Sequence, residues 1–350
     1  MTPPIFAEES VNWSKKNRLI GFLEASTIPF ELDAPLNKYC WLPSSAVCAC
    51  AVTPTSIIAL ASVLEYCNNQ GIFYKVLGNT SNCFFPANER YGCFIFTNRL
   101  NAITIDWIAQ EVRAECGASL SSLALKTAKH GIAGFAGMVG IPGTVGGAVV
   151  MNAGSYGDSI GDTLDRIEFL DQHNRRITLR ASELNLGYRS SALRDGVLSG
   201  AVLQAVFRLV RDDDAVLGRK LAAARTLRAT TQEKRLPNLG SLFATKFLYE
   251  DIAKHHPAYW VILRLYFWVF YRVARWVFRW TPPPSYLNRL TLFWFGKSFS
   301  PQPFSDFTMN CYVYRVDDDT VFFEYINWIK VLTHNTVVLE NEIVREPRSL

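Results

Sequence analysis

With 350 residues, 49% of them apolar and 19% charged, the chain is large enough for two or three domains, and this composition excludes an intrinsically disordered protein. The net charge of +5, from 36 basic and 31 acidic residues spread along the chain, suits small anionic ligands and argues against binding to nucleic acid. Eight cysteines without a CxxC pair, and an N-terminus without a basic segment followed by an apolar one, predict free thiols, no metal site and a cytoplasmic location.

The first part of the chain predicts a helix and then a strand–helix–strand unit. Apolar residues at helical spacing predict a short helix over 10–25. A strand that ends at the sequence PTS, a helix over 57–70 and a buried strand over 72–77 form a βαβ unit. The turn GNTSN, residues 78–82, follows that strand directly. By itself it is an ordinary turn, although successive backbone amides at such a place can bind phosphate oxygens.

A glycine-rich stretch from residue 131 to residue 162 dominates the middle of the chain. It follows strands predicted at 93–97 and 102–116 and a helix that starts at Ser119, and it holds ten of the 21 glycines in 32 residues. The stretch carries no charge before residue 152, and its glycines exclude a long helix or strand. A binding loop in a buried site explains these properties best. A generic structural loop remains an alternative, whereas a collagen-like helix and a membrane span are disfavoured.

Further strands and an acidic linker follow the glycine-rich stretch. Two strands around a QHN turn are predicted within 166–180, and an apolar strand within 197–210. Three aspartates at 212–214 mark a domain boundary, after which a helix is predicted over 216–229. The predicted division is an N-terminal helical segment 1–29, a domain 30–212 with subdomains of about 30–97 and 98–212, and a second domain 215–350.

Residues 258–280 form the most unusual segment of the second domain. The sequence AYWVILRLYFWVFYRVARWVFRW is long enough to span a bilayer, but it carries four arginines, at 264, 272, 275 and 279. At 100° per residue these arginines fall within an arc of about 80°, so we expect an amphipathic helix with a basic stripe and a broad aromatic face. Packing inside the protein, association with a membrane surface or partner, and spanning are the alternatives. We predict an interfacial helix.

The sequence GIPGTVGGAVVMNAGSYG, residues 140–157, resembles the flavin-binding signature of the UDP-N-acetylenolpyruvoylglucosamine reductase family. The resemblance covers about 35–245 and 303–345, and it is far more specific than a short glycine motif. It implies an α+β fold: a two-part FAD-binding domain of the PCMH type, as in vanillyl-alcohol-oxidase-like flavoproteins, and a C-terminal α+β substrate domain. The cofactor-binding residues that it implies are Gly78, Asn79, Thr80, Ser81, Asn82, Gly140, Ile141, Pro142, Gly143, Thr144, Gly146, Gly147, Asn152, Ala153 and Gly154.

The same resemblance assigns three catalytic residues. Ser241, in Gly-Ser-Leu-Phe, matches the proton-donating serine of the family, Arg189 matches its Tyr-Arg-x-Ser run, and Glu342, in Leu-Glu-Asn-Glu-Ile, matches its second catalytic carboxylate. Without this context, Arg189 would read as a surface strand end and Glu342 as an exposed terminal carboxylate. Delivery of a hydride to an enol ether needs such groups: an arginine for the carboxylate, a buried acid and a proton donor. The implied substrate-binding residues are Tyr188, Arg189, Ser190 and Asn310.

These matches imply an FAD-dependent oxidoreductase that uses NADPH or NADH to reduce an enolpyruvyl UDP-sugar of the cell envelope. Two alternatives are a flavoenzyme for another sugar nucleotide or secondary metabolite and a flavin-binding protein without turnover. The first is suggested by residues 247–303, where the family pattern is missing, and the second by Asn79, Thr80 and Ala244, which replace family residues. The predicted helix 258–280 adds the expectation of a peripheral protein at the inner membrane surface.

Overall fold

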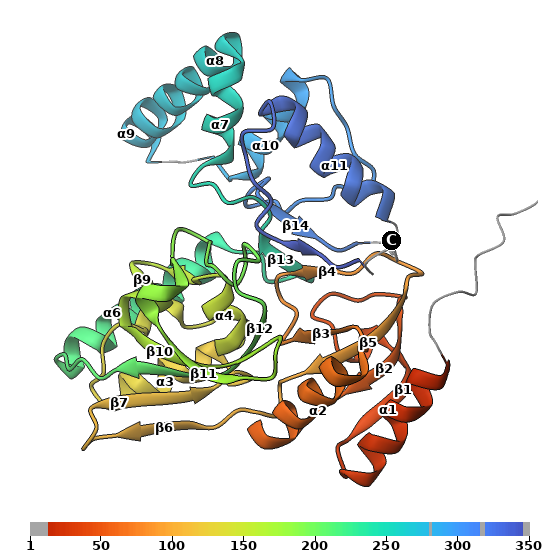
Figure 1. The fold of residues 1–350 in the computed structure, drawn as a ribbon. Helices are drawn as coiled ribbons and strands as arrows, with labels where there is room; N and C mark the ends of the chain where they lie inside the picture. The colour runs from red at the N-terminus through yellow and green to blue at the C-terminus, as the bar shows by residue number, and fades with distance from the viewer. Residues whose placement is uncertain (1–12, 280–281, 316–318, 346–350) are drawn as a thin grey trace, which may run out of the picture.

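The computed structural model describes residues 13–279, 282–315 and 319–345. The first subdomain contains a four-stranded sheet in the order β1-β2-β5-β3, in which β1 is antiparallel to β2 and the other strands are parallel (Figure 1). Ser56 begins helix α2 by accepting a hydrogen bond from Ala59 N at 3.1 Å, and Gly71 ends it with a φ of 58°. The elements are α1 (Trp13–Ala25), β1 (Phe30–Pro35), the 3₁₀ helix η1 (Leu36–Lys38), β2 (Val47–Val52), α2 (Ile57–Gln70), β3 (Tyr74–Leu77), β4 (Cys83–Phe84) and β5 (Arg90–Phe96).

The second subdomain is built on a five-stranded antiparallel sheet in the order β11-β10-β12-β7-β6. Its buried side chains, among them Val112, Ile167 and Phe207, share one core with residues of α2 and β2, so the two subdomains form a single packed unit. Helix α6 packs against α3 and η2, although the predicted boundary precedes it. The elements are β6 (Ile103–Asp106), β7 (Glu111–Glu115), α3 (Leu120–Lys129), η2 (Ala136–Met138), α4 (Val145–Val150), β8 (Gly154–Ser155), β9 (Asp158–Ser159), α5 (Ile160–Thr163), β10 (Leu164–Asp171), β11 (Arg176–Arg180), η3 (Ala181–Leu184), β12 (Gly200–Arg208) and α6 (Asp214–Thr231).

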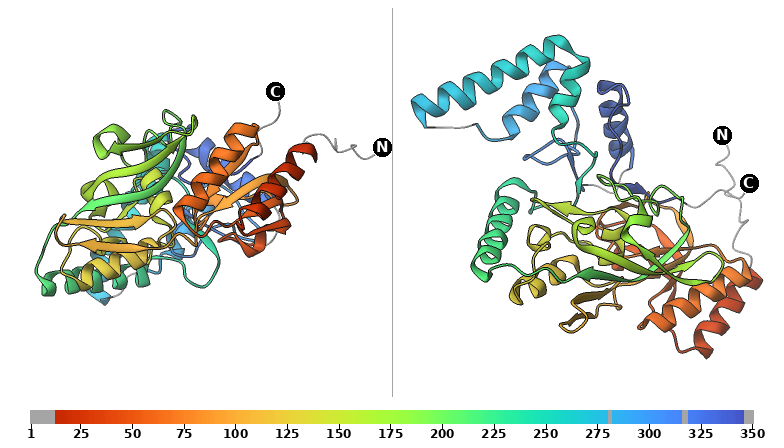
Figure 2. Two further views of the ribbon diagram at one scale, coloured as in Figure 1. Left: turned by 60° about the horizontal axis from the view of Figure 1, so that its bottom comes forward. Right: turned by 60° about the vertical axis from the view of Figure 1, so that its left-hand side comes forward.

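The C-terminal domain is mainly helical and has a second core, in which Phe243, Phe304 and Phe322 are fully buried. Helices α8 and α9, joined by a π-helical turn, form one rod that projects from this domain (Figure 2). No helix within the described ranges is both long and apolar enough to cross a membrane. The elements are β13 (Asn238–Ser241), α7 (Leu248–His255), α8 (Pro257–Phe267), the π turn η4 (Trp268–Ala274), α9 (Arg275–Phe278), α10 (Ser285–Trp294), β14 (Cys311–Val313), α11 (Asp319–Leu332) and β15 (Glu342–Ile343).

Residues 338–344 connect the C-terminal domain to the first one. The first half of this segment pairs with residues 242–244 through backbone hydrogen bonds of 2.8 and 2.9 Å. In the second half, β15 pairs in parallel with β4 of the first subdomain. The segment therefore lies between the two domains and holds them together.

Most of the predicted elements are present, and two differ. Strand β5 lies between β2 and β3, so the two strands of the predicted βαβ unit are not neighbours. β5 is buried over nearly its whole length, as a central strand must be. The predicted helix 258–280 is continuous but not uniformly α-helical, because the π turn joins α8 to α9. Residues 10–12 and 280 of the predicted helices lie outside the described residues.

Candidate active site

Two glycine-bearing segments meet beyond β3 and at the start of α4. A Cβ atom on Gly78 would lie only 2.1 Å from Thr144 Oγ1, so only glycine allows this close approach. Residues 143–145 are anchored next to α3 by backbone hydrogen bonds with Leu120 at 3.0 Å and with Ala118 at 2.8 Å. The turn after β3 and the glycine-rich stretch therefore form one rigid surface, which we call the cradle (residues 78–82 and 140–147).

The cradle offers backbone donors that the protein itself does not use. Within the described ranges, the N–H groups of residues 79–82 donate no hydrogen bond. Thr80 has a φ of 52°, which is unfavourable for a β-branched residue, and its buried Oγ1 accepts a hydrogen bond from Trp41 N at 2.7 Å. Asn79 Nδ2 donates to Pro142 O at 2.5 Å and links the two segments. Successive free amides of this kind bind anions.

A cavity of about 530 Å³ opens over the cradle and extends to α6, β13 and the segment 338–344. Its walls therefore come from both domains. Most of the predicted site residues line it. They are Gly78, Asn79, Thr80, Ser81, Asn82, Gly140, Ile141, Pro142, Gly143, Thr144, Gly147, Ala153, Gly154, Arg189, Ser241 and Glu342.

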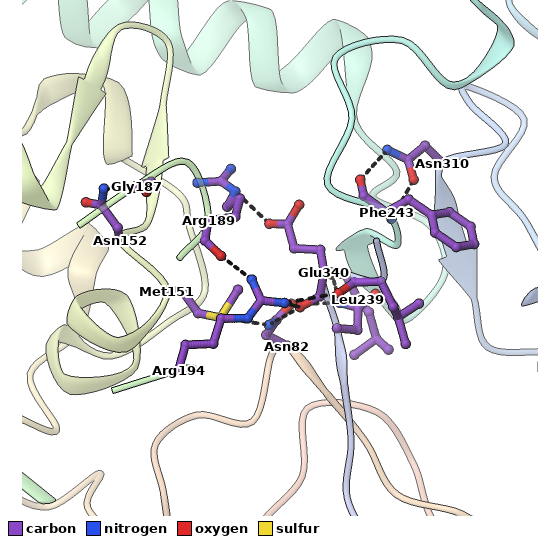
Figure 3. A network of polar contacts seen from close by, with 12 residues as sticks. Asn82, Met151, Asn152, Gly187, Arg189, Arg194, Leu239, Phe243, Asn310 and Glu340 are labelled. Carbon is purple, nitrogen blue, oxygen red and sulfur yellow. Dashed lines mark hydrogen bonds and ion pairs between the residues drawn. The ribbon is translucent and has the colours of Figure 1, made fainter. Parts of the chain in front are cut away.

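Five predicted residues are not among the described residues that line the cavity: Gly146, Asn152, Tyr188, Ser190 and Asn310. Asn152 supports the loops, because its amide donates to Gly187 O at 2.8 Å and accepts from Gly161 N at 3.0 Å. Asn310 forms two hydrogen bonds, of 2.8 and 2.9 Å, with the backbone of Phe243, two residues after Ser241 (Figure 3). Asn310 thus braces the chain next to the predicted proton donor.

Arg189 enters the cavity beside a buried carboxylate. Its Nε lies 2.7 Å from Glu340 Oε1 (Figure 3). Its guanidinium lies over the ring of Tyr188, which is 63% exposed. Arg194 donates to the carbonyl oxygen of Arg189 and, at 3.0 Å, to Leu339 O. Burial raises the pKa of Glu340, while Arg189 and Arg194 act in the opposite direction. Arg194 therefore joins the Arg189 loop to the C-terminal segment.

Two carboxylates, not one, reach the cavity from the C-terminal segment. The side chain of Glu342 is 53% exposed and forms an ion pair with Lys75, whereas the side chain of Glu340 is only 12% exposed. Both glutamates line the cavity, although each has a different basic partner. Ser241, at the end of β13, lines the same cavity. The predicted serine, arginine and glutamate are thus brought to one place.

Arg228 of α6 is a cavity residue that the sequence did not single out. Its guanidinium donates to Gln232 Oε1 at 2.7 Å and to Ser155 Oγ at 3.1 Å, but its buried Nε has no partner in the described chain. No carboxylate of the described residues forms an ion pair with it, and burial lowers the pKa of Arg228. An uncompensated arginine in a cavity fits an anionic ligand. Four basic residues occur along this helix, so sequence spacing could not identify the one that faces the cavity.

Comparison with known proteins decides the family. A family model described as an FAD binding domain matches residues 48–180. The UDP-N-acetylenolpyruvoylglucosamine reductase of Streptococcus pneumoniae (strain 70585) is 33% identical over 231 residues, which are 66% of this chain and 74% of the relative. The same enzyme of strain Hungary19A-6 matches with equal identity and coverage. The chain belongs to the UDP-N-acetylenolpyruvoylglucosamine reductase family.

The reductase family also matches in three dimensions. The crystal structure of UDP-N-acetylenolpyruvylglucosamine reductase (MurB) from Thermus caldophilus has a TM-score of 0.61 and 20% identity, and the match covers 90% of this chain and 98% of that chain. At this identity the likeness shows a shared fold. The predicted α+β fold with an FAD-binding domain is therefore confirmed.

As a member of this reductase family, the chain is an FAD-dependent oxidoreductase. The residues of the cradle fit the cofactor. The free N–H groups of residues 79–82 can donate hydrogen bonds to the oxygens of a pyrophosphate, and Gly78 allows the two backbone segments to approach closely. Arg228 adds a positive charge at the same cavity. When FAD is bound, it supplies the hydride chemistry, and the protein supplies position and electrostatics.

Proposed function

We propose that the chain is the reductase of an enolpyruvyl ether of a UDP-sugar, with NADPH as the hydride donor. The observation that carries this proposal is that one cavity, built over the flavin cradle, is lined by Arg189, Ser241, Glu340 and Glu342. The enolpyruvyl substrate has a carboxylate, a double bond that accepts a hydride, and an adjacent carbon that accepts a proton. The cavity has a group suited to each end of this reaction.

Each residue has a separate role in the proposed reaction. The Arg189 guanidinium binds the substrate carboxylate and stabilises the negative charge that develops next to it. The hydroxyl of Ser241 donates the proton that completes the saturated product. Glu342 acts as the second acid, and Asn310 holds the backbone beside Ser241. Tyr188 and Ser190 flank Arg189 at the rim and contact the sugar nucleotide.

We also propose that the enzyme is cytoplasmic and associates peripherally with the inner membrane surface. Residues 257–279, which contain α8, the π turn η4 and α9, support this proposal, because they carry exposed aromatic side chains and four arginines. The association concerns location and does not enter the reaction.

The test is NADPH oxidation by the purified, FAD-loaded protein with the enolpyruvyl ether of UDP-N-acetylglucosamine. We expect substrate-dependent oxidation of NADPH, with one equivalent of the lactyl ether formed for each NADPH consumed. Oxidation that occurs only with another unsaturated sugar nucleotide would identify a different substrate. A protein that binds FAD but reduces no such sugar would contradict the proposal.

A further inference from the structure

The rod formed by residues 257–279, here called the arm, is firmly attached by one face of α8. Tyr259, Leu263 and Tyr266 are at most 7% exposed and belong to the core of the C-terminal domain. Tyr259 also shares a hydrogen bond of 2.7 Å with Thr291 of α10. Of the alternatives for residues 258–280, packing inside the protein therefore describes this one face of α8.

The outer face of α8 is apolar and basic together. Trp260 and Trp268 are 47% and 57% exposed, and Leu265 between them is 52% exposed. Arg264 lies on this same face, with its guanidinium 4.8 Å from the centre of the Trp260 ring. The predicted separation of a basic stripe from an aromatic face does not hold at Arg264, because its guanidinium lies over the Trp260 ring.

Among its described side chains, the distal half of the arm shows no packed face. Every side chain described from residue 271 to residue 279 is exposed, including Trp276 at 85% and Val277 at 51%. Figure 2 shows this part of the rod extending away from the rest of the molecule. A monomeric protein rarely leaves so many large apolar side chains together in water, and such a surface marks a binding site.

The charges of the arm indicate an anionic ligand. Residues 257–279 contain four arginines and neither aspartate nor glutamate. Within the described chain, none of the four forms an ion pair, whereas Lys254 and Lys297 nearby are each paired with a carboxylate. A second copy of the arm would repel this one. Exposed tryptophans among unpaired arginines match the boundary of a bilayer that contains anionic lipids.

We propose that the arm is a docking element for anionic lipid headgroups, with Trp268 and Trp276 at the acyl boundary and the arginines at the phosphates. The proposal specifies the surface responsible for the peripheral location proposed above, and therefore rests on it. The reductase cavity is lined by none of the arm residues, so membrane binding and catalysis are separable. Each arginine near the surface should strengthen binding roughly five-fold.

The experiment is co-sedimentation of the full, FAD-loaded protein with two kinds of vesicle: phosphatidylcholine alone, and phosphatidylcholine with one third phosphatidylserine. We expect binding to the anionic vesicles, weakening as salt rises above 0.1 M, and little binding to the neutral ones. Arg272→Gln with Arg275→Gln should weaken binding roughly 25-fold. Trp276→Ala should weaken it as well. The matched control is Arg219→Gln with Arg225→Gln, two exposed arginines of α6 that should not matter.

Activity in lipid-free solution separates this proposal from the reductase function, because all four proteins should reduce the sugar nucleotide equally. Equal binding to neutral and anionic vesicles, or equal loss in the arm and control variants, would overturn the proposal. Absence of vesicle binding together with self-association that Trp276→Ala abolishes would also overturn it, because the arm would then be a protein interface. If the wild-type protein binds anionic vesicles but does not reduce the sugar nucleotide, only the reductase function is contradicted.

Discussion

Replacing Gly78 with alanine tests whether contact between the two segments of the cradle creates the flavin site. The added Cβ would lie 2.1 Å from Thr144 Oγ1 and 3.1 Å from Thr144 Cβ. The segments must therefore separate by roughly 1 Å, and overpacking of this kind costs about 1–3 kcal/mol. Alanine offsets about 0.4–1 kcal/mol of this by restricting the unfolded chain. We expect the free energy of unfolding of the FAD-free protein to fall by about 1–2 kcal/mol.

The same change should weaken FAD binding, because it moves the free amides of residues 79–82 relative to the glycine-rich stretch. A loss of about 1.4 kcal/mol corresponds to a tenfold rise in the dissociation constant. Urea unfolding measures the stability, and quenching of flavin fluorescence measures the affinity. Gly218→Ala is the matched control, because nothing lies within 4 Å of a Cβ at that helical position. It should leave FAD binding unchanged and stabilise the protein by up to about 1 kcal/mol.

Thr144→Ala provides the decisive comparison. It removes the atom that the new Cβ would meet, at the cost of the N-terminal cap of α4, which is about 0.5–2 kcal/mol. The double variant Gly78→Ala with Thr144→Ala should therefore be less destabilised than the sum of the two single variants, by at least about 0.5 kcal/mol. Strict additivity, or a Gly78→Ala protein with wild-type stability and FAD affinity, would refute the reasoning.

Three further predictions concern the cavity. Arg228→Ala should weaken FAD binding at least about tenfold and Arg228→Lys less, because the arginine has no carboxylate partner of its own; an unchanged affinity in fluorescence titration would assign it to another ligand. Ser241→Ala should leave the reduction of FAD by NADPH intact and slow the reaction of the reduced enzyme with the enolpyruvyl sugar about 10²–10⁴-fold, as measured by stopped-flow absorbance. If this second reaction proceeds at the wild-type rate, the serine is not the proton donor. Burial raises the pKa of Glu340 above its ordinary 4.5, so the folded protein holds this proton more tightly and loses stability as the pH rises above that value. Glu340→Gln should therefore gain stability relative to the wild type between pH 4.5 and pH 7, and a pH-independent difference in urea unfolding would contradict this.

The glycine-rich half of the cradle could be predicted from the sequence because its signal is local, whereas the turn 78–82 could be assigned only through the family resemblance. Glycine density between residues 131 and 162 reports where backbones approach closely, and the contact of Gly78 with Thr144 is an approach of that kind. Likewise, Ser56 and Gly71 bound α2 through hydrogen bonds within one turn. The glycine density and the caps of α2 depend on neighbours in sequence and are therefore readable from it, whereas the contact of Gly78 with Thr144 joins two distant segments.

The partners of the site residues could not be predicted, because they come from distant parts of the chain. Arg189 meets Glu340 rather than Glu342 only because the segment 338–344 threads between the domains. Arg228 is placed at the cavity by the packing of α6, which the spacing of its basic residues does not encode. The role of Glu342 as the second acid stays a prediction, and the partner that the structure gives its carboxylate is Lys75.

The position of the segment 338–344 also has a consequence for the order of events during synthesis. Ser241 is translated about 100 residues before Glu340, so at about 5–20 residues per second the two are separated by roughly 5–20 s. During this interval the residues of the cradle and of the α6 wall have been synthesised, whereas those of the strand that closes the cavity have not. A nascent chain can thus acquire its flavin before its substrate wall, and we expect ribosome-bound chains stalled before residue 338 to be yellow and inactive.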